Sequence, residues 1–304
     1  MLDKHRLKTI LVWLIALGSA SLAVLVGYLL FLWHVSADTR DTYTPQPGGS
    51  LVICGGGAVP DEAYQCFMDL AGGSHARLAI IPSYEPSPKD AQRLIEAWRG
   101  RGAESVVVLH AASRSQCNDP AFVKPLGDAT GVWLSGGQQS HLSERYVDTE
   151  VERQLKALLD RNGVIGGSSA GAAAMSRIMI SGGLSEAVDG RGFDLLPGAV
   201  IDQHFLFRNR LQRLLGVLNA NPGVIGLGID ERTAVLVQRK GRTMIALGES
   251  YSVICLPQGQ KFPRIEILKP GDRTDIEVLK ERPGEYAIGS PAALKQFIEA
   301  ASAK

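Results

Sequence analysis

The sequence predicts an α/β fold built on a doubly wound, mostly parallel sheet flanked by helices. Short apolar runs typical of buried strands alternate, between residues 51 and 168, with segments in which apolar residues recur at helical spacing. Glycine-rich turns follow two of these runs, and one of them, Gly167-Ser168-Ser169-Ala170-Gly171, fits G-x-S-x-G. Because ligands bind at the carboxyl ends of parallel strands, both turns are candidate positions for a site.

Composition limits the classes of function. The chain has 304 residues, of which 45% are hydrophobic, enough for one substantial core. A net charge of +1 gives no electrostatic argument for nucleic acid or for an acidic surface partner. Neither histidines nor cysteines show metal-ligand spacing, so we expect no metal and no cofactor. The cysteines are too few and too scattered to predict a disulfide scaffold: Cys54, Cys66, Cys117 and Cys255.

The N-terminal segment predicts a membrane anchor over residues 10–34. It is apolar and long enough to cross a hydrocarbon layer of about 30 Å. Lys4, Arg6 and Lys8 precede it, and the positive-inside rule then places the rest of the chain on the non-cytoplasmic side, periplasmic or extracellular. The alternatives are a signal peptide cleaved after Val35-Ser36-Ala37, which would export the chain equally, and a buried core helix.

Five segments follow from this interpretation. The polar, Pro- and Thr-containing stretch after the anchor has the composition of a linker. The segments are a cytoplasmic N-terminus (1–9), the anchor (10–34), the linker (35–49), a globular domain (50–270) and a C-terminal extension (271–304).

The expected elements come in chain order. Buried strands are predicted where the chain is uniformly apolar: Leu51–Cys54, Arg77–Ile81, Val106–Leu109 and Thr130–Leu134. Helices are predicted near Asp61 and where apolar residues recur every three to four positions: Lys89–Arg99, Pro120–Leu126 and Val147–Arg161. After residue 222 we expect consecutive strands, antiparallel at the sheet edge: Val224–Ile229, Thr233–Val237, Thr243–Leu247 and Tyr251–Leu256. The last elements expected are a strand over Asp275–Leu279 and a helix over Pro291–Ala300.

The turn Gly55-Gly56-Gly57, after the first strand, has two interpretations. A phosphate-binding loop would need G-x-G-x-x-G, and Pro60 stands at the last glycine position. We therefore expect a tight turn between strand and helix.

Ser169 is the candidate nucleophile, because G-x-S-x-G places its second serine on a strained turn between strand and helix. The helix after it would direct its N-terminal dipole at this serine, and the N–H of Ala170 is a candidate oxyanion donor. The structural alternative is a tight packing turn of small residues. His204 follows an apolar run and is a candidate base or a capping residue, and either Asp230 or Glu231 could orient it.

Four ordered motifs together make residues 50–258 resemble the cyanophycinase branch of the peptidase E-like serine peptidases. They are Gly136-Gly137-Gln138-Gln139, the Ser169 turn, PGAVIDQHFLFRNRLQRLL around His204, and GLGIDERTA from Gly226 to Ala234. The resemblance implies a class I glutamine amidotransferase-like fold with Ser169 as nucleophile, His204 as base and Glu231 as acid. It also implies oxyanion donors at Gly137 and Ala170.

The same resemblance implies a substrate and a pocket for it. Cyanophycinases cut cyanophycin, a poly-aspartate carrying arginine on each side chain, into β-aspartyl-arginine dipeptides, and they are usually homodimers. The positions that match the pocket are Gln139, Asp202, Gln203, Arg208, Arg210 and Arg213. Gln138 departs from the Asp or Asn expected in the G-G-x-Q turn. Other acidic or isoaspartyl peptides, and a non-catalytic membrane-tethered binding module, remain alternatives.

Overall fold

The computed structural model describes residues 43–183, 186–238, 242–258 and 261–281. The predicted anchor over residues 10–34 and the predicted helix over Pro291–Ala300 lie outside these ranges. Within them, no helix combines the length and apolar character needed to cross a membrane. The anchor, and the homodimer implied by the resemblance, stay predictions.

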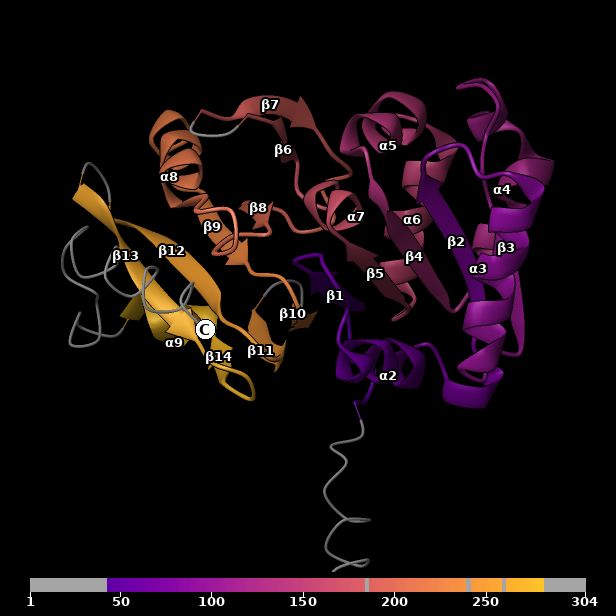
Figure 1. Ribbon diagram of the computed structural model, residues 1–304, viewed down its shortest axis with the longest axis horizontal. Helices are drawn as coiled ribbons and strands as arrows, with labels where there is room; N and C mark the ends of the chain where they lie inside the picture. The colour runs from indigo at the N-terminus through magenta and orange to yellow at the C-terminus, as the bar shows by residue number, and fades with distance from the viewer. Residues whose placement is uncertain (1–42, 184–185, 239–241, 259–260, 282–304) are drawn as a thin grey trace, which may run out of the picture. The chain divides into compact units, whose positions relative to one another are not determined.

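A central sheet of eight strands organises the described chain, in the order β14-β11-β10-β1-β5-β4-β2-β3. Figure 1 shows it crossing the molecule from β3 to β14. The five strands from β1 to β3 in this order are parallel, and β10, β11 and β14 pair antiparallel. The bounds are β1 (Ser50–Cys54), β2 (Arg77–Ser83), β3 (Ser105–Val108), β4 (Gly131–Gly137), β5 (Val164–Ser168), β10 (Thr233–Gln238), β11 (Thr243–Gly248) and β14 (Arg273–Asp275).

Helices cover both faces of this sheet, because successive side chains of each strand point to opposite faces. Val52 and Cys54 pack toward the face covered by α2 (Asp61–Leu70) and α3 (Pro88–Gly100). Leu51 and Ile53 pack toward the opposite face. The helices on that face are α4 (Pro120–Asp128), α5 (Gln139–Tyr146), α6 (Glu150–Asp160), α7 (Ala170–Ala173) and α9 (Ile276–Glu281).

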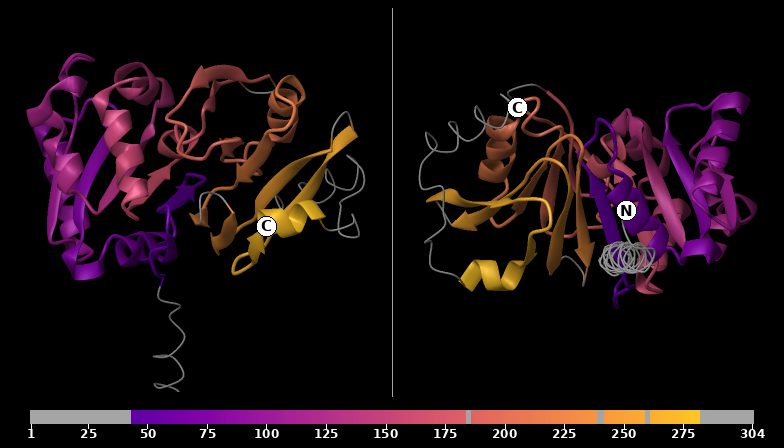
Figure 2. Two further views of the ribbon diagram at one scale, coloured as in Figure 1. Left: turned by 180° about the vertical axis from the view of Figure 1, so that it is seen from behind. Right: turned by 60° about the horizontal axis from the view of Figure 1, so that its bottom comes forward.

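A second sheet, in the order β13-β12-β9-β8, packs against this same face. Its strands are β8 (Ala199–Gln203), β9 (Ile225–Ile229), β12 (Ser252–Gln258) and β13 (Lys261–Leu268). Its outer face is covered by α8 (Leu211–Ala220), the orange helix beside it in Figure 2. A hairpin of β6 (Ile178–Gly182) and β7 (Val188–Arg191) completes the strands, and two short 3₁₀ helices lie at Gly73–His75 and Gln116–Asn118.

The predicted alternation of strands and helices is confirmed for the parallel half, but the antiparallel edge is only partly right. β10 and β11 do extend the central sheet, whereas β9 and β12 belong to the second sheet. β9 and β12 lie between two cores: β12 has apolar side chains on both faces, and β9 has Gly226 and Gly228 on the face toward the α8 side. No local pattern in these strands indicates which strands they pair with.

The predicted strand over Asp275–Leu279 is wrong, because a helix begins at Ile276. Ile276 and Leu279 lie three residues apart and are both buried, which is helical spacing. In so short a run, an alternating pattern fits a strand equally well. The preceding strand β14 pairs with β11, so the central sheet continues past the expected domain boundary at residue 270.

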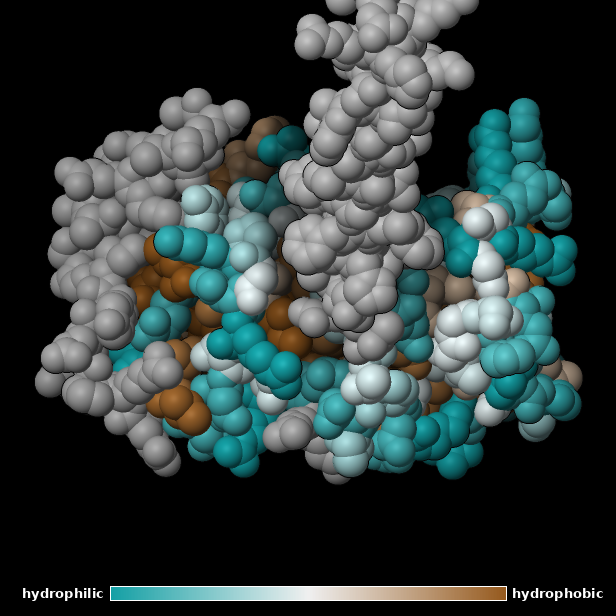
Figure 3. Space-filling view, turned by 90° about the horizontal axis from the view of Figure 1, so that it is seen from below, coloured by the Kyte–Doolittle hydropathy of each residue, from teal (hydrophilic) through white to brown (hydrophobic). Residues whose placement is uncertain are grey.

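Polar side chains cover most of the described surface on the face shown in Figure 3, and apolar residues show between them in smaller patches. The thiols lie inside. All four cysteines are buried and free: Cys54, Cys66, Cys117 and Cys255.

Candidate active site

Ser169 stands on a strained turn at the end of β5, between β1 and β4 in the central sheet. Its φ is +52° and its ψ is −109°, a conformation that L residues rarely adopt. The Ser169 N–H donates to the carbonyl of Cys54 at 3.0 Å, which fixes the turn to the neighbouring strand. A Cβ on Gly171 would lie 2.1 Å from the Leu134 carbonyl oxygen, so the motif needs glycine there.

The helix after Ser169 is shorter than the sequence suggests. It comprises four residues, Ala170–Ala173, so a full helix dipole directed at the serine is not available. Local backbone N–H groups remain as donors.

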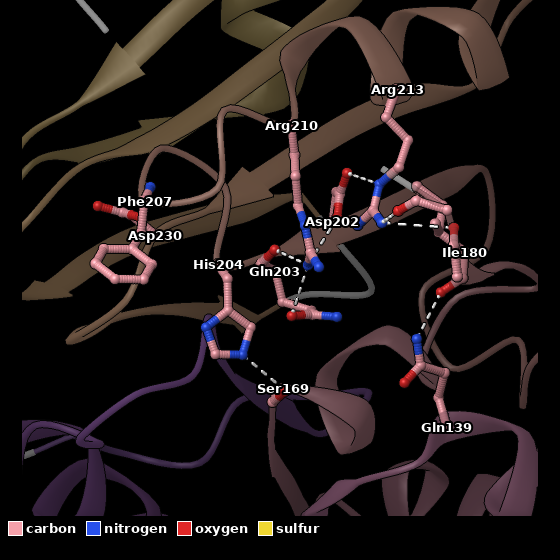
Figure 4. A network of polar contacts seen from close by, with 12 residues as sticks. Gln139, Ser169, Ile180, Asp202, Gln203, His204, Phe207, Arg210, Arg213 and Asp230 are labelled. Carbon is pink, nitrogen blue, oxygen red and sulfur yellow. Dashed lines mark hydrogen bonds and ion pairs between the residues drawn. The ribbon is translucent and has the colours of Figure 1, made fainter. Parts of the chain in front are cut away.

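His204 and Glu231 converge on this serine from the ends of β8 and β9. Ser169 Oγ lies 2.9 Å from His204 Nε2, and His204 Nδ1 is hydrogen-bonded to a carboxylate oxygen of Glu231. Figure 4 shows the imidazole ring directed at the serine. The structure therefore brings the three predicted triad residues into one hydrogen-bonded chain.

Asp230, the other candidate for orienting the base, has a different set of partners. It accepts hydrogen bonds from the N–H groups of Leu206 (3.1 Å) and Phe207 (2.8 Å) and from the hydroxyl of Ser250 (2.7 Å). It thereby fixes the loop that follows His204, while the adjacent Glu231 contacts the imidazole.

The triple-glycine turn after β1 is part of the site, which sequence reasoning missed. The Gly55 carbonyl accepts from the N–H of His204 at 2.7 Å, and the Gly56 carbonyl accepts from Arg232 at 3.1 Å. A Cβ on Gly56 would lie 2.4 Å from His204 Cε1. The turn expected there is confirmed, and glycine is required in it because the imidazole occupies the space of a side chain.

The two predicted oxyanion donors lie on two different segments near Ser169. Ala170 follows it directly, and Gly137 is the last residue of β4. A Cβ on Gly136 would lie 3.5 Å from the Cβ of Ser169, so the end of β4 reaches the serine. The hydroxyl of Ser83 donates to the Gly136 carbonyl at 2.6 Å and holds this strand end.

Four of the six predicted pocket residues form one buried cluster (Figure 4). Arg213 donates to both carboxylate oxygens of Asp202, with Nε at 3.0 Å from Oδ2, and its side chain is 2% exposed. Arg210 donates to the backbone carbonyl of Gln203 at 2.6 Å. Burial raises the pKa of Asp202 despite the opposing effect of Arg213, and burial lowers the pKa of Arg210 to about 10.

The other two predicted pocket residues lie elsewhere. Gln139 donates to the carbonyls of Ile180 and Ser181, both at 3.0 Å, and so ties α5 to the β6–β7 hairpin. Arg208 is exposed.

A cavity of about 410 Å³ opens beside Ser169, within the size range of small-molecule sites. Ser169, His204 and Gly136 are among its lining residues, and none of the six predicted pocket residues is. Tyr64 and Trp98 also line it. These aromatic residues carry no sequence signal of a site, because they are dispersed over separate elements and fit ordinary core positions.

Comparisons with known proteins identify the family of this chain. Residues 51–245 match peptidase family S51. The cyanophycinase of Nostoc sp. (strain PCC 7120 / SAG 25.82 / UTEX 2576) is 32% identical over 287 residues, covering 84% of this chain and 96% of the relative. The cyanophycinase of Synechococcus elongatus is 35% identical over 237 residues, covering 74% of this chain and 73% of the relative.

A solved structure supports the fold. The crystal structure of a peptidase from an acI-B1 Actinobacterium superposes with a TM-score of 0.56 at 22% identity, covering 75% of this chain and 96% of the other. The family match and the two relatives, taken with a serine that contacts a histidine, lead to one conclusion. The chain belongs to peptidase family S51 and is a cyanophycinase-like, serine-type peptidase.

Proposed function

We propose that the chain hydrolyses β-aspartyl peptide bonds through Ser169, His204 and Glu231. The observation that carries this proposal is the 2.9 Å contact between Ser169 Oγ and His204 Nε2, with Glu231 on the other ring nitrogen. In such a triad the histidine accepts the serine proton and the carboxylate stabilises the resulting imidazolium.

The proposed reaction has two steps. Ser169 Oγ attacks the carbonyl carbon, His204 takes its proton, and the oxyanion is stabilised by the backbone N–H groups of Gly137 and Ala170. His204 then gives that proton to the leaving amine as the C–N bond breaks, which leaves an acyl-enzyme. Water, deprotonated by His204, attacks the ester, and the proton returns to Ser169 as the acid product leaves.

The proposed substrate is a cyanophycin-like polymer of aspartate and arginine, released as β-aspartyl-arginine dipeptides. The names of the two relatives and the charges around His204 support it.

In the direct test, the full-length protein is incubated with cyanophycin and the dipeptide product is followed by mass spectrometry, with Ser169→Ala as the negative control. A panel of isoaspartyl dipeptides tests the alternative substrates. A protein that turns over neither polymer nor dipeptides, and that a serine-reactive probe does not label, would be a binding module.

The activity is expected to fall at acid pH, with a midpoint below the ordinary histidine pKa of about 6.5. Burial lowers the pKa of His204, and the hydrogen bond that His204 donates to Glu231 opposes this only in part. Only the neutral imidazole can accept the serine proton, so kcat/KM should rise with pH through this pKa and be near its plateau at pH 7. Glu231→Gln should move the midpoint lower still, and Arg208→Met should move it higher, because the Arg208 charge disfavours the imidazolium. Shifts in the same direction for both variants would contradict this account.

Arg208 is the arginine of the predicted pocket that we expect to contact substrate carboxylates directly, because it is exposed whereas Arg210 and Arg213 are buried. Arg208→Met should lower kcat/KM for the polymer about ten- to a hundredfold, the value of a charge-assisted contact. Its melting temperature should barely change. Arg213→Met should instead lower the melting temperature, because it leaves Asp202 buried without its partner. Equal loss of kcat/KM for the polymer and for a neutral peptide in Arg208→Met would exclude a role in substrate selection.

We also propose that residues 10–34 anchor the protein and leave its catalytic part on the non-cytoplasmic side. The charge-free apolar run and the preceding Lys4, Arg6 and Lys8 support this orientation. A reporter that works only in the cytoplasm, fused after Lys304, is expected to stay silent, and one that works only outside should be active. An active cytoplasmic reporter at that position would reverse the proposed topology.

A further inference from the structure

The cavity beside Ser169 has lining residues of two kinds. Ser135, Ser169 and His204 are polar, and Tyr64, Trp98 and Trp133 are aromatic. A group bound against the aromatic residues would therefore lie in the same cavity as the serine hydroxyl.

The three aromatic rings that line the cavity pack together as one unit. The ring centroids of Trp98 and Trp133 are 5.0 Å apart, and Tyr64 lies 5.4 Å from Trp98 and 5.3 Å from Trp133. They come from α3, β4 and α2, and the two tryptophans are only 4% and 5% exposed. Walls held this firmly need little reordering when an apolar side chain enters.

One cation lies next to these rings. The Arg101 guanidinium carbon is 4.0 Å from the centre of the Tyr64 ring, and Arg101 also lines the cavity. Its carboxylate partner, Asp61, is 3.7 Å away and fully exposed, so solvent weakens this pair. The Tyr64 ring thus already holds a cation, which disfavours a second guanidinium and leaves Arg101 available to a carboxylate.

We propose that this cavity is a subsite for an apolar, preferably aromatic, side chain on a residue flanking the scissile bond, with the free carboxylate of that residue toward Arg101. The proposal rests on the proposed function, since it takes Ser169 as the reacting group. It extends the substrates from arginine-bearing polymer to isoaspartyl peptides that end in an apolar residue. The cavity and its rings carry this assignment, because the predicted pocket residues do not line it.

Binding of three small probes tests the subsite without requiring turnover. N-acetyl-L-phenylalanine, N-acetyl-L-arginine and N-acetylglycine are titrated into the full-length protein by calorimetry. We expect N-acetylphenylalanine to bind at least about tenfold more tightly than either of the others. Arg101→Gln should weaken N-acetylphenylalanine and N-acetylglycine by a similar factor, because both carry the carboxylate.

Two matched variants connect the binding to the cavity. Ala97 lies on α3, is exposed and lines the cavity, so Ala97→Phe should fill it and abolish the preference for N-acetylphenylalanine. Ala121 is an exposed alanine on α4 that does not line the cavity, and Ala121→Phe should keep the preference.

The possible outcomes separate the two proposals. Equal or tighter binding of N-acetylarginine, or an unchanged preference in Ala97→Phe, would overturn the subsite even if the polymer is cleaved. A preference lost only in Ala97→Phe supports the subsite even if the polymer is not a substrate. Kinetics with β-aspartyl-phenylalanine and β-aspartyl-arginine then show whether the same preference appears in kcat/KM.

Discussion

Ser169→Ala and His204→Ala are each expected to lower kcat by about 10⁴- to 10⁶-fold, the loss found when a triad nucleophile or base is removed. In the proposed mechanism, the contact between these two residues lets the serine transfer its proton to the imidazole at neutral pH. Glu231→Gln should leave more activity, because the carboxylate only orients the imidazole and stabilises its charge. Steady-state kinetics on the polymer, with circular dichroism to confirm folding, measure all three.

The adjacent serine is the matched control. Ser168 is the last residue of β5 and also borders the cavity, yet only Ser169 occupies the strained turn that presents its hydroxyl to His204. Ser168→Ala should lower kcat less than about tenfold. The double variant Ser169→Ala with His204→Ala should be no worse than either single one, because the two residues act as a unit. Comparable losses in Ser168→Ala and Ser169→Ala would show that the G-x-S-x-G motif misidentifies the nucleophile.

The parallel half of the fold was open to prediction because its strands are mostly short apolar runs, and because β1 and β2 are each followed by a helix at the expected place. β1, β2 and β4 each appear where the sequence predicts a strand. The second sheet could not be predicted. β8 pairs with β9 in parallel, and β9 pairs with β12 across the two strands that separate them in sequence. Such pairing depends on which apolar faces meet in three dimensions, and the local hydrophobic pattern of a strand does not determine its partner.

A site residue could be predicted from the sequence where a recognisable motif contains it. Ser169 follows from G-x-S-x-G, whereas choosing Glu231 over Asp230 needed the family resemblance. The resemblance implies that Arg208, Arg210 and Arg213 all belong to the substrate pocket, whereas α8 packs on the second sheet and buries Arg213. The aromatic residues that line the cavity gave no signal in the sequence, because they come from three separate elements.

Gly56→Ala is expected to lower kcat/KM by about 10²- to 10⁴-fold while the protein stays folded. The new Cβ would lie 2.4 Å from Cε1 and 2.5 Å from Nε2 of His204, so the imidazole has to move. A displacement of about 1 Å at a reacting group can cost about 100-fold, and complete loss of the base sets the upper limit. The loss should appear mainly in kcat, since the proposed mechanism assigns the proton transfer to the His204 ring.

The matched control separates this contact from the backbone strain of an alanine at positive φ. Gly102 has a φ of +96°, close to the +109° of Gly56, and an added Cβ there would meet nothing within 4 Å. The backbone strain should therefore cost both variants a similar amount of stability, on the order of 1–2 kcal/mol, with a further loss in Gly56→Ala from displacing the imidazole, and only Gly56→Ala should lose activity. Equal activity in the two variants would mean that the imidazole moves aside at no cost. The His204 position shown here would then not be the one that reacts.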